Sequence, residues 1–382
     1  MSATSDRRAH VLGPTIVSGA NVSAANVSGA NVSAANVSGA NVSAANVSGT
    51  NVSGTNVSAT NVREANGRDV LLEFEGLRVE VPTPVGPRPV LRSVSLAIAA
   101  GEAVGLVGES GSGKSMTARS VLGMLPAGAT RSGAVRFRGA EIGGLDAAGL
   151  RRLRSRDVAM VFQDPRATVN PVRTVGDFLT EVLRERGLSR PAALAKAGGI
   201  LEDIGVDHLR RRLKQRPYEL SGGLLQRVVI AAALAGEPDL ILADEPTTAL
   251  DVTTQEEVVA ILDEQRRQRG TALLFISHDL ELATAVCDRI AVMYAGEIVE
   301  ILPAAQLHEA ARHPYTKALL RARPGSVPPG ERLQTVPGVP QSAIDAPPGC
   351  VFADRCPVAE SICRTVVPAL VGGVACHLEG VS

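Results

Sequence analysis

The segment from Gly108 to Ser115 constrains the fold of this chain more than any other. It reads Gly-Glu-Ser-Gly-Ser-Gly-Lys-Ser and satisfies the phosphate-loop pattern G-x-x-x-x-G-K-[S/T]. A buried-strand pattern, Glu102–Val107, precedes it, and a helical pattern from Lys114 to about Leu125 follows it. Glycines let successive backbone N–H groups turn inward around a β-phosphate, and the start of the helix adds a favourable dipole. The chain is therefore predicted to contain an α/β domain that binds a nucleotide.

The positions of this loop are assigned to the phosphates and their metal ion. Lys114 supplies a point charge for the β- and γ-phosphates, and the hydroxyl group of Ser115 can ligate Mg²⁺. The alternative is a chance glycine-rich turn, which the flanking strand and helix disfavour. The predicted nucleotide contacts are Gly108, Glu109, Ser110, Gly111, Ser112, Gly113, Lys114, Ser115 and Met116.

Two carboxylates end an apolar strand further along the chain, Leu240-Ile-Leu-Ala-Asp244-Glu245. We predict that Asp244 holds Mg²⁺ through water and that Glu245 polarises the attacking water as a general base. A lone Asp-Glu pair after a strand is usually a solvated strand end. Its place downstream of a phosphate loop favours the metal and base interpretation.

The segment Ser221-Gly222-Gly223 lies between the phosphate loop and these carboxylates. With the motifs in this order, the chain resembles the nucleotide-binding subunit of an ATP-binding cassette (ABC) transporter. The resemblance implies ATP and Mg²⁺ as ligands. It also implies that Ser221, Gly222 and Gly223 begin a helix whose donors meet a γ-phosphate held by an opposite subunit.

The same resemblance assigns roles to three further residues. Gln163 matches the glutamine that senses the γ-phosphate and the metal. Asp251, in Ala249-Leu250-Asp251, matches the loop that crosses the dimer interface. His278, just after the strand pattern of residues 272–277, matches the switch histidine that contacts the γ-phosphate. A lone Gln or His is more often an incidental surface residue. The order of these residues along the chain, together with the phosphate loop and the Asp244-Glu245 pair, favours the functional interpretation.

Other segments resemble the oligopeptide/dipeptide importer branch of this family, namely Phe162-Gln163-Asp164-Pro165, Asn170-Pro171, the segment from Glu245 to Thr253, and His313-Pro314-Tyr315-Thr316 before a cysteine-bearing tail. This resemblance implies an ATPase that powers the import of di- or oligopeptides at the cytoplasmic face of the membrane. Its partners would be a second ATPase subunit (identical or different), two permeases and an extracellular or periplasmic binding protein. The alternatives are a nickel or other non-peptide importer of the same branch, and a soluble non-transport ABC ATPase.

The predicted fold class is α/β, a phosphate-loop NTPase of the ABC type. It comprises a RecA-like core, an antiparallel β subdomain and a helical subdomain. We expect strands at Leu71–Phe74, Leu91–Ile98, Asp239–Ala243 and Ala272–Ser277, and mostly helix over 150–235. The predicted divisions are a repeat arm at 1–66, the nucleotide-binding domain at 67–310, and a C-terminal extension at 311–382.

The arm repeats a five-residue unit, Ala-Asn-Val-Ser-Ala or a close variant, from Ala20 to Glu64. Each unit offers one Val among Ser, Asn, Ala and Gly, which is too little apolar surface for a packed core. We therefore predict a low-complexity, disordered arm. The alternative is a four-sided β-solenoid of the pentapeptide-repeat type, with Val inside.

The tail carries four of the 5 cysteines, Cys350, Cys356, Cys363 and Cys376. In the importer branch this tail is associated with a 4Fe–4S cluster, for which four thiolates are suitable ligands. Zinc is a second possibility, although short Cys-x2-Cys pairs are absent. Buried thiols without metal are the third. Cys287 lies elsewhere and is expected to be a core thiol.

Charge and apolar patterning exclude some functions. The 39 basic and 39 acidic residues cancel, which argues against a nucleic-acid protein that neutralises phosphates by bulk charge. No apolar run approaches the ~18 residues of a membrane span, so we expect a cytosolic, peripheral protein. The sequence departs from the family in having no aromatic residue between Phe74 and Lys114 to stack on adenine. Leu224 is a second, milder departure, because the position after Gly223 is commonly polar or Met.

Overall fold

The computed structural model describes residues 69–248, 250–323 and 335–378. The predicted repeat arm at 1–66 lies outside these residues. Among the residues described, no helix is both long and apolar enough to span a bilayer.

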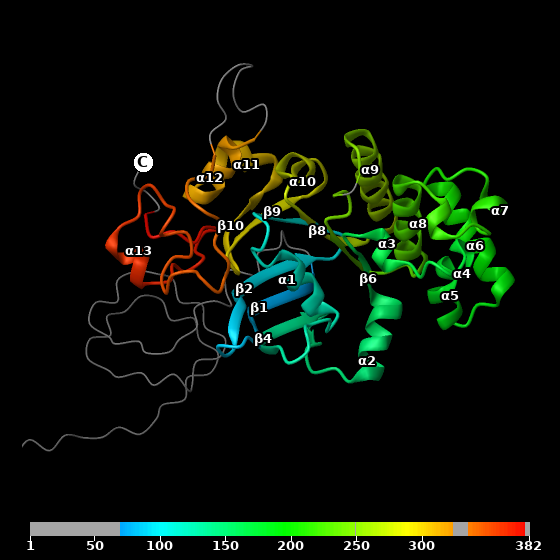
Figure 1. Cartoon of the computed structure of the whole chain (residues 1–382), viewed down its shortest axis with the longest axis horizontal. Coiled ribbons are helices and arrows are strands. Elements are labelled where there is room, and N and C mark those ends of the chain that lie inside the picture. The colour runs from blue at the N-terminus through cyan, green and yellow to red at the C-terminus, as the bar shows by residue number, and fades with distance from the viewer. Residues whose placement is uncertain (1–68, 249, 324–334, 379–382) are drawn as a thin grey trace, which may run out of the picture. The chain divides into compact units, whose positions relative to one another are not determined.

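One mixed sheet organises this part of the chain (Figure 1). Its 10 strands follow the order β5-β4-β1-β2-β10-β9-β3-β8-β7-β6. Their bounds are β1 Val70–Val81, β2 Arg88–Ala99, β3 Ala103–Val107, β4 Thr130–Phe137, β5 Ala140–Glu141, β6 Val158–Val161, β7 Leu240–Asp244, β8 Ala272–Ser277, β9 Arg289–Tyr294 and β10 Glu297–Pro303.

The strands from β9 to β6 form a parallel half. Every residue of β3, β7 and β8 is buried, as expected for parallel strands covered on both faces. This is why these segments read as unbroken apolar runs in the sequence. The register pairs Val107 with Ser277 and Asp244 with Ile276, so the carboxyl ends of the three strands share one edge. The residues that follow these strands therefore meet at that edge.

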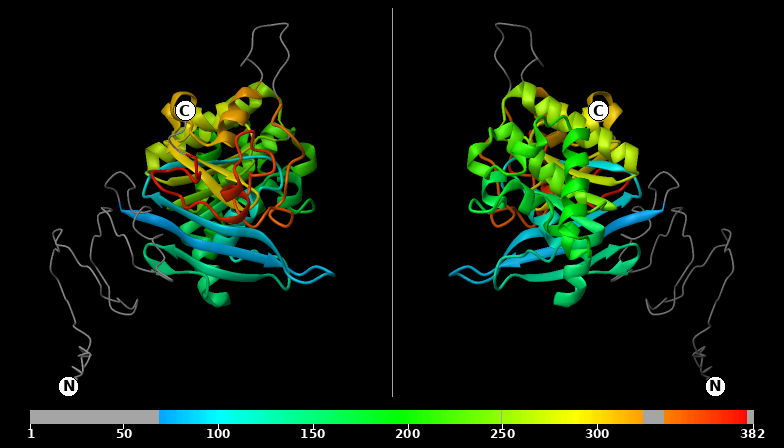
Figure 2. Two further views of the ribbon diagram at one scale, coloured as in Figure 1. Left: turned by 90° about the vertical axis from the view of Figure 1, so that its left-hand side faces the viewer. Right: turned by 90° about the vertical axis from the view of Figure 1, so that its right-hand side faces the viewer.

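The strands β1, β2, β4 and β5 form an antiparallel half, and Figure 2 shows the long strands β1 and β2 running beside β4. A single register pair, Glu297 with Ser93, joins the two halves. A tight turn joins β1 and β2, where Thr83 and Gly86 exchange backbone hydrogen bonds of 3.2 and 3.0 Å.

Helices cover the parallel half and form a separate group beyond β6, where α4 to α8 gather (Figure 1). The helices are α1 Lys114–Val121, α2 Ala147–Arg152, α3 Pro165–Thr168, α4 Val175–Leu179, α5 Glu181–Glu185, α6 Arg190–Asp203, α7 Leu209–Arg212, α8 Gly222–Ala235, α9 Val252–Arg269, α10 Leu280–Val286, α11 Leu307–Ala310, α12 Pro314–Arg321 and α13 Ser361–Thr365. The group beyond β6 is the predicted helical subdomain.

The C-terminal extension packs against β10. The backbone N–H of Ala375 donates to the carbonyl of Val299 at 2.9 Å, and that of Ile301 donates to Gly373 at 2.7 Å. Its large side chains, including Tyr315 and Phe352, enter the same apolar cluster as the parallel strands and α8. The extension therefore shares the core of the nucleotide-binding domain.

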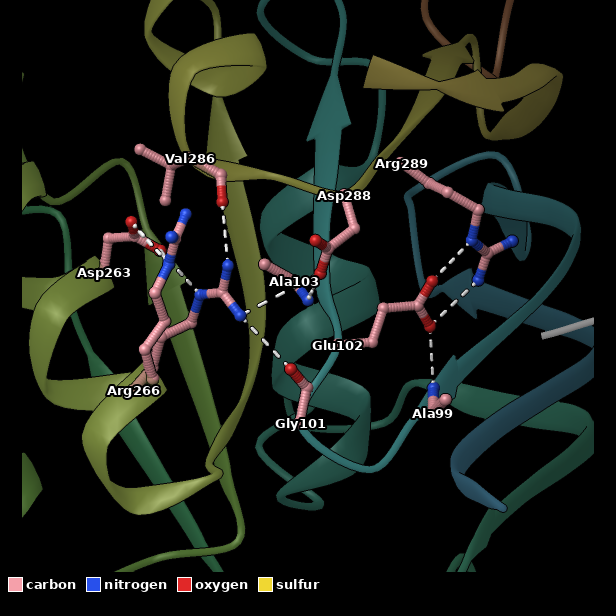
Figure 3. Close-up of polar contacts among 10 residues, drawn as sticks. Ala99, Gly101, Glu102, Ala103, Asp263, Arg266, Val286, Asp288 and Arg289 are labelled. Atoms are coloured by element: carbon pink, nitrogen blue, oxygen red, sulfur yellow. Dashed lines mark hydrogen bonds and ion pairs between the residues drawn. The ribbon is translucent and has the colours of Figure 1, made fainter. Parts of the chain in front are cut away.

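Buried charged residues fix the end of β3 that lies opposite the phosphate loop (Figure 3). Glu102 is 3% exposed, accepts from the N–H of Ala99 at 2.8 Å and pairs with Nε of Arg289 at 2.6 Å. Beside it, Arg266 of α9 donates to the carbonyl of Gly101 at 3.1 Å. Because a buried charge is tolerated only when paired or hydrogen-bonded, these contacts favour one position for the start of β3.

The structure corrects several predicted elements. The strand expected at Leu71–Phe74 continues to Val81, and the helix from Lys114 ends at Val121. The strands β4, β6, β9 and β10 are additions, and β6 interrupts the region expected to be mostly helical. Its four residues are too short to show a period of two against the surrounding helical pattern.

Candidate functional site

The phosphate loop leaves the sheet between β3 and α1, as the sequence predicts. Two of its glycines are required by the backbone. Gly108 has φ 154°, and a β-carbon there would collide with the carbonyl oxygen of Met293. Gly113, with φ 106°, caps α1, and a β-carbon would lie 2.6 Å from Leu91. Only glycine adopts these conformations without strain, so both positions depend on it.

Lys114 lies inside the loop and is 5% exposed. Its Nζ donates to the carbonyl oxygens of Gly108 at 2.8 Å and Glu109 at 2.9 Å. Burial lowers the pKa of Lys114, and the carboxylates of Glu245, Asp244 and Glu109 oppose that shift. The ammonium group is thus held inside the loop. An incoming phosphate oxygen can replace one of the two backbone carbonyls as its hydrogen-bond acceptor.

Ser115 and Asp244 form the pair expected of a metal site. The Ser115 hydroxyl donates to Oδ1 of Asp244 at 2.6 Å, and Asp244 is fully buried. Burial raises the pKa of Asp244, which the Ser115 hydrogen bond and the Arg119 charge counteract. Its second oxygen, Oδ2, is buried, accepts no hydrogen bond from the described residues and lies 3.6 Å from Nη2 of Arg119. A hard divalent cation would satisfy such an oxygen set, so these residues fit Mg²⁺.

Two other predicted site residues, Gln163 and His278, lie close to one carboxylate oxygen of Glu245. Its Oε2 accepts from Gln163 Nε2 at 2.9 Å and from Thr248 Oγ1 at 2.8 Å, and lies 3.6 Å from His278 Nδ1. Gln163, Glu245 and His278 follow β6, β7 and β8, which are neighbours in the parallel sheet. Glu245 has φ 45°, a conformation that is uncommon outside glycine and often marks a functional site.

The predicted partner-facing residues lie apart from this cluster. Ser221 caps α8 by accepting from the N–H of Leu224 at 3.3 Å. The atoms nearest a β-carbon on Gly222 and Gly223 belong to Leu250 and Thr254, not to the phosphate loop. In these contacts, Ser221, Gly222 and Gly223 touch the segment around α9 and not the phosphate loop of their own chain.

Asp251 caps α9. It accepts from the N–H of Thr254 at 3.1 Å and from its hydroxyl at 2.8 Å, and these hydrogen bonds lower the pKa of Asp251. Ser110 and Gly111 are exposed on the phosphate loop, while Met116 packs into the core below it. Ala249 lies outside the described residues.

Three contacts of the site escaped the sequence analysis. Thr248 supports Glu245, as described above. Tyr315 accepts a hydrogen bond from the backbone N–H of Glu109 at 2.9 Å, and Arg355 forms an ion pair with the Glu109 carboxylate at 2.6 Å. Tyr315 entered the sequence analysis only as part of a family segment. No spacing rule connects Glu109 with Tyr315 or Arg355, so no local signal could have assigned these two contacts. Thr248 lies three residues after Glu245, within the segment that resembles the family.

The cysteine set does not form a metal centre in this arrangement. Cys350 and Cys363 are buried, and the backbone N–H of Cys350 donates to the carbonyl of Cys363 at 2.7 Å. Burial raises the pKa of Cys350 to about 11, with the nearby thiols of Cys363, Cys356 and Cys376 acting in the same direction. Within the described ranges, no three His, Cys, Asp or Glu side chains are placed to hold a metal ion. Cys287 is a buried core thiol, as expected.

Fold and site together define a phosphate-loop NTPase. Comparison with known proteins narrows the class. Residues 91–248 match the family described as ABC transporter, and residues 299–363 match the oligopeptide/dipeptide transporter C-terminal region. The chain is 41% identical over 301 residues to the oligopeptide transport ATP-binding protein OppD of Escherichia coli (strain K12), covering 78% of this chain and 89% of that one.

Two further proteins extend this comparison. A putative peptide import ATP-binding protein of Brucella abortus (strain 2308) is 40% identical over 317 residues, covering 79% of this chain and 94% of that one. Among solved structures, the dimeric ATP-binding cassette MJ0796 bound to ADP and Pi is 27% identical with a TM-score of 0.56, over 61% of this chain and 99% of that chain. The chain belongs to the ATP-binding subunits of ABC transporters, in the oligopeptide/dipeptide branch, and the predicted family and fold class are confirmed.

Proposed function

We propose that this chain hydrolyses ATP and thereby powers the import of di- or oligopeptides through a membrane permease. One observation carries the proposal. Gln163, Thr248 and His278 converge on Oε2 of Glu245, with the closest contact at 2.8 Å, at the sheet edge that also presents the phosphate loop and Asp244. The relatives named above are peptide-transport ATP-binding proteins, which supports the choice of transported solute.

The residues divide the reaction between them. Lys114 and the loop N–H groups receive the phosphates, and Glu245 accepts the proton of the attacking water. Gln163 and Thr248 orient the Glu245 carboxylate, and His278 lies beside it to meet the γ-phosphate. Mg²⁺, held by Ser115, Asp244 and Gln163, would neutralise charge on the phosphate oxygens when bound.

The site is completed by a second subunit. Ser221, Gly222 and Gly223 would offer the α8 N-terminus to ATP bound on the partner, with Asp251 at the interface. This accounts for their place away from the phosphate loop of their own chain. The cassette MJ0796, a dimer, is the precedent among the similar structures.

The remaining partners follow from the transporter family. Two permeases would form the channel, and an extracellular or periplasmic binding protein would deliver the solute. The chain would then work at the cytoplasmic face of the membrane as a peripheral subunit. We retain the division into 67–310 and 311–382 as part of this proposal.

The proposal includes a 4Fe–4S cluster bound by the C-terminal extension. It relies on the resemblance and on the four cysteines, whose side chains do not form a metal site in the described arrangement. We derive no step of the reaction from such a cluster.

Uptake in the source organism tests the transport function. Deleting the gene should abolish uptake of a labelled tripeptide, and a plasmid copy of the parent should restore it, whereas Lys114→Ala should not. Labelled nickel, measured in the same cells, is the internal comparison. Loss of nickel uptake with unchanged peptide uptake would assign the chain to a metal importer, and no change in either would favour a non-transport ATPase.

A further inference from the structure

The C-terminal extension contacts the phosphate loop at Glu109, through both its backbone and its side chain. The Glu109 N–H donates to Oη of Tyr315 at 2.9 Å. The Glu109 carboxylate accepts from Nη1 of Arg355 at 2.6 Å and from Nη2 at 3.2 Å, a bidentate pair. Tyr315 is fully buried and the Arg355 side chain is 3% exposed, so these contacts are shielded from water.

Glu109 in turn positions Lys114, the lysine that is proposed to bind the phosphates. Its carbonyl oxygen accepts from Nζ of Lys114 at 2.9 Å and from the N–H of Ser112 at 3.3 Å. Glu109 therefore links the extension to the group that binds the β- and γ-phosphates. A change in its backbone would move the anchor of Lys114.

Arg355 is itself rigidly placed. Its Nε donates to the carbonyl of Pro337 at 2.5 Å, and its Nη1 donates to Oη of Tyr294 at 3.1 Å. The guanidinium carbon lies 5.5 Å from the centre of the Tyr294 ring and 5.8 Å from that of Phe352. Such a held guanidinium loses little further conformational entropy when it pairs with Glu109.

The pair also has an electrostatic consequence. Glu109 carries a negative charge in the loop that must receive an anionic triphosphate. Arg355 neutralises this charge in a partly dehydrated setting, where screening by salt is weak. Without Arg355, the carboxylate would repel the nucleotide and would also lose its orientation.

We infer that Arg355 and Tyr315 are positioning residues of the ATPase site. From the extension they hold Glu109, and through it the phosphate loop, in the conformation that receives the triphosphate. This inference rests on the proposed ATP-binding function. The C-terminal extension thus contributes residues that support the nucleotide site.

A double-mutant cycle on the full-length chain tests the pair. The measured quantities are the Kd for MgATP, by fluorescent-nucleotide titration, and the melting temperature. Arg355→Met should weaken binding about tenfold, equivalent to about 1.4 kcal/mol. Glu109→Gln breaks the same pair and should also raise the Kd, by less than Arg355→Met does, because it leaves no unpaired negative charge. The double variant should bind as Glu109→Gln does, because Arg355 acts through Glu109.

Two matched variants separate positioning from stability. Arg364 pairs with Asp354 at 2.7 Å in the same extension, but it is 59% exposed and makes no described contact with the phosphate loop. Arg364→Met should therefore leave the Kd unchanged. Tyr315→Phe removes a single oxygen and leaves the Glu109 N–H unpaired, so it should raise the Kd several-fold even if Arg355→Met fails to fold.

The outcomes distinguish this inference from the proposed function. If the parent binds ATP and Lys114→Ala abolishes binding, but Tyr315→Phe and Arg355→Met both keep the parental Kd, the inference is overturned and the ATPase stands. If the effects of Arg355→Met and Glu109→Gln on the Kd add in the double variant, Arg355 does not act through Glu109, which also overturns it. If the parent itself does not bind ATP, the proposed function fails first.

Discussion

His313 gives the extension a pH-dependent stability whose size can be worked out. Its side chain is 1% exposed, and Nδ1 accepts from the N–H of Tyr315 at 3.1 Å, which caps α12. Burial lowers the pKa of His313 from 6.5 to about 4, and the backbone of Ala375 opposes the shift. The carboxylate of Glu300 accepts from the backbone N–H of His313 at 3.2 Å, and the Phe352 ring lies 6.0 Å from the imidazole. The folded protein therefore keeps this imidazole neutral.

The sign of the effect follows from proton linkage. Between pH 6.5 and about 4 the unfolded chain binds a proton at His313 and the folded chain does not. The stabilisation is thus complete above pH 6.5 and is lost as the pH falls toward 4. The full difference corresponds to about 3 kcal/mol at ~1.4 kcal/mol per pKa unit.

Urea unfolding at several pH values between 7.5 and about 4.5, followed by near-ultraviolet circular dichroism, measures this loss. The variant His313→Asn keeps a capping oxygen but cannot titrate. As the pH is lowered over this range, its free energy of unfolding should therefore fall by about 2–3 kcal/mol less than that of the parent. His308→Asn is the matched control, because His308 is 45% exposed and should leave the parental slope unchanged. Parallel pH curves for parent and His313→Asn would refute the reasoning.

Three further predictions concern other parts of the chain. Glu102→Ala leaves the half-buried Arg289 without its carboxylate and should lower the free energy of unfolding by about 2–3 kcal/mol, measured by urea titration; a loss under ~1 kcal/mol would contradict this. Deleting residues 1–64 should leave ATPase activity and melting temperature nearly unchanged, whereas a large fall in melting temperature would indicate a packed solenoid. Anaerobically purified protein should contain about four irons and lose them in Cys356→Ser if the tail holds a cluster. One zinc or no metal would exclude that cluster.

The residues that the sequence assigns to the nucleotide site carry local signals. The phosphate loop is a continuous motif, and the fully buried strands β3, β7 and β8 produce apolar runs that end at Gly108, Glu245 and His278. The family resemblance supplied a role for Gln163, but its contact with Glu245 follows from the strand order, in which β6 lies beside β7. The short strand β6, directly before Gln163, was hidden in a helical region.

Features that depend on long-range packing could not be predicted. The hairpin of β9 and β10 turns through Ala295 and Gly296, with φ of 44° and 82°, a two-residue turn without the Asn-Gly or Asp-Gly signal. The contacts of Glu109 with Tyr315 and Arg355 span 206 and 246 residues. Only the packing of the extension against β10 brings these residues to the phosphate loop.

The central claim is that Glu245 is the general base of an ATPase. The most direct measurement compares MgATP binding and steady-state hydrolysis for the parent and Glu245→Gln. The control is Glu257→Gln, because Glu257 pairs with Arg227 on the surface at 2.6 Å. We predict that Glu245→Gln binds MgATP as the parent does but hydrolyses it at least ~100-fold more slowly, while Glu257→Gln is unaffected. Hydrolysis by Glu245→Gln at near the parental rate would contradict the account.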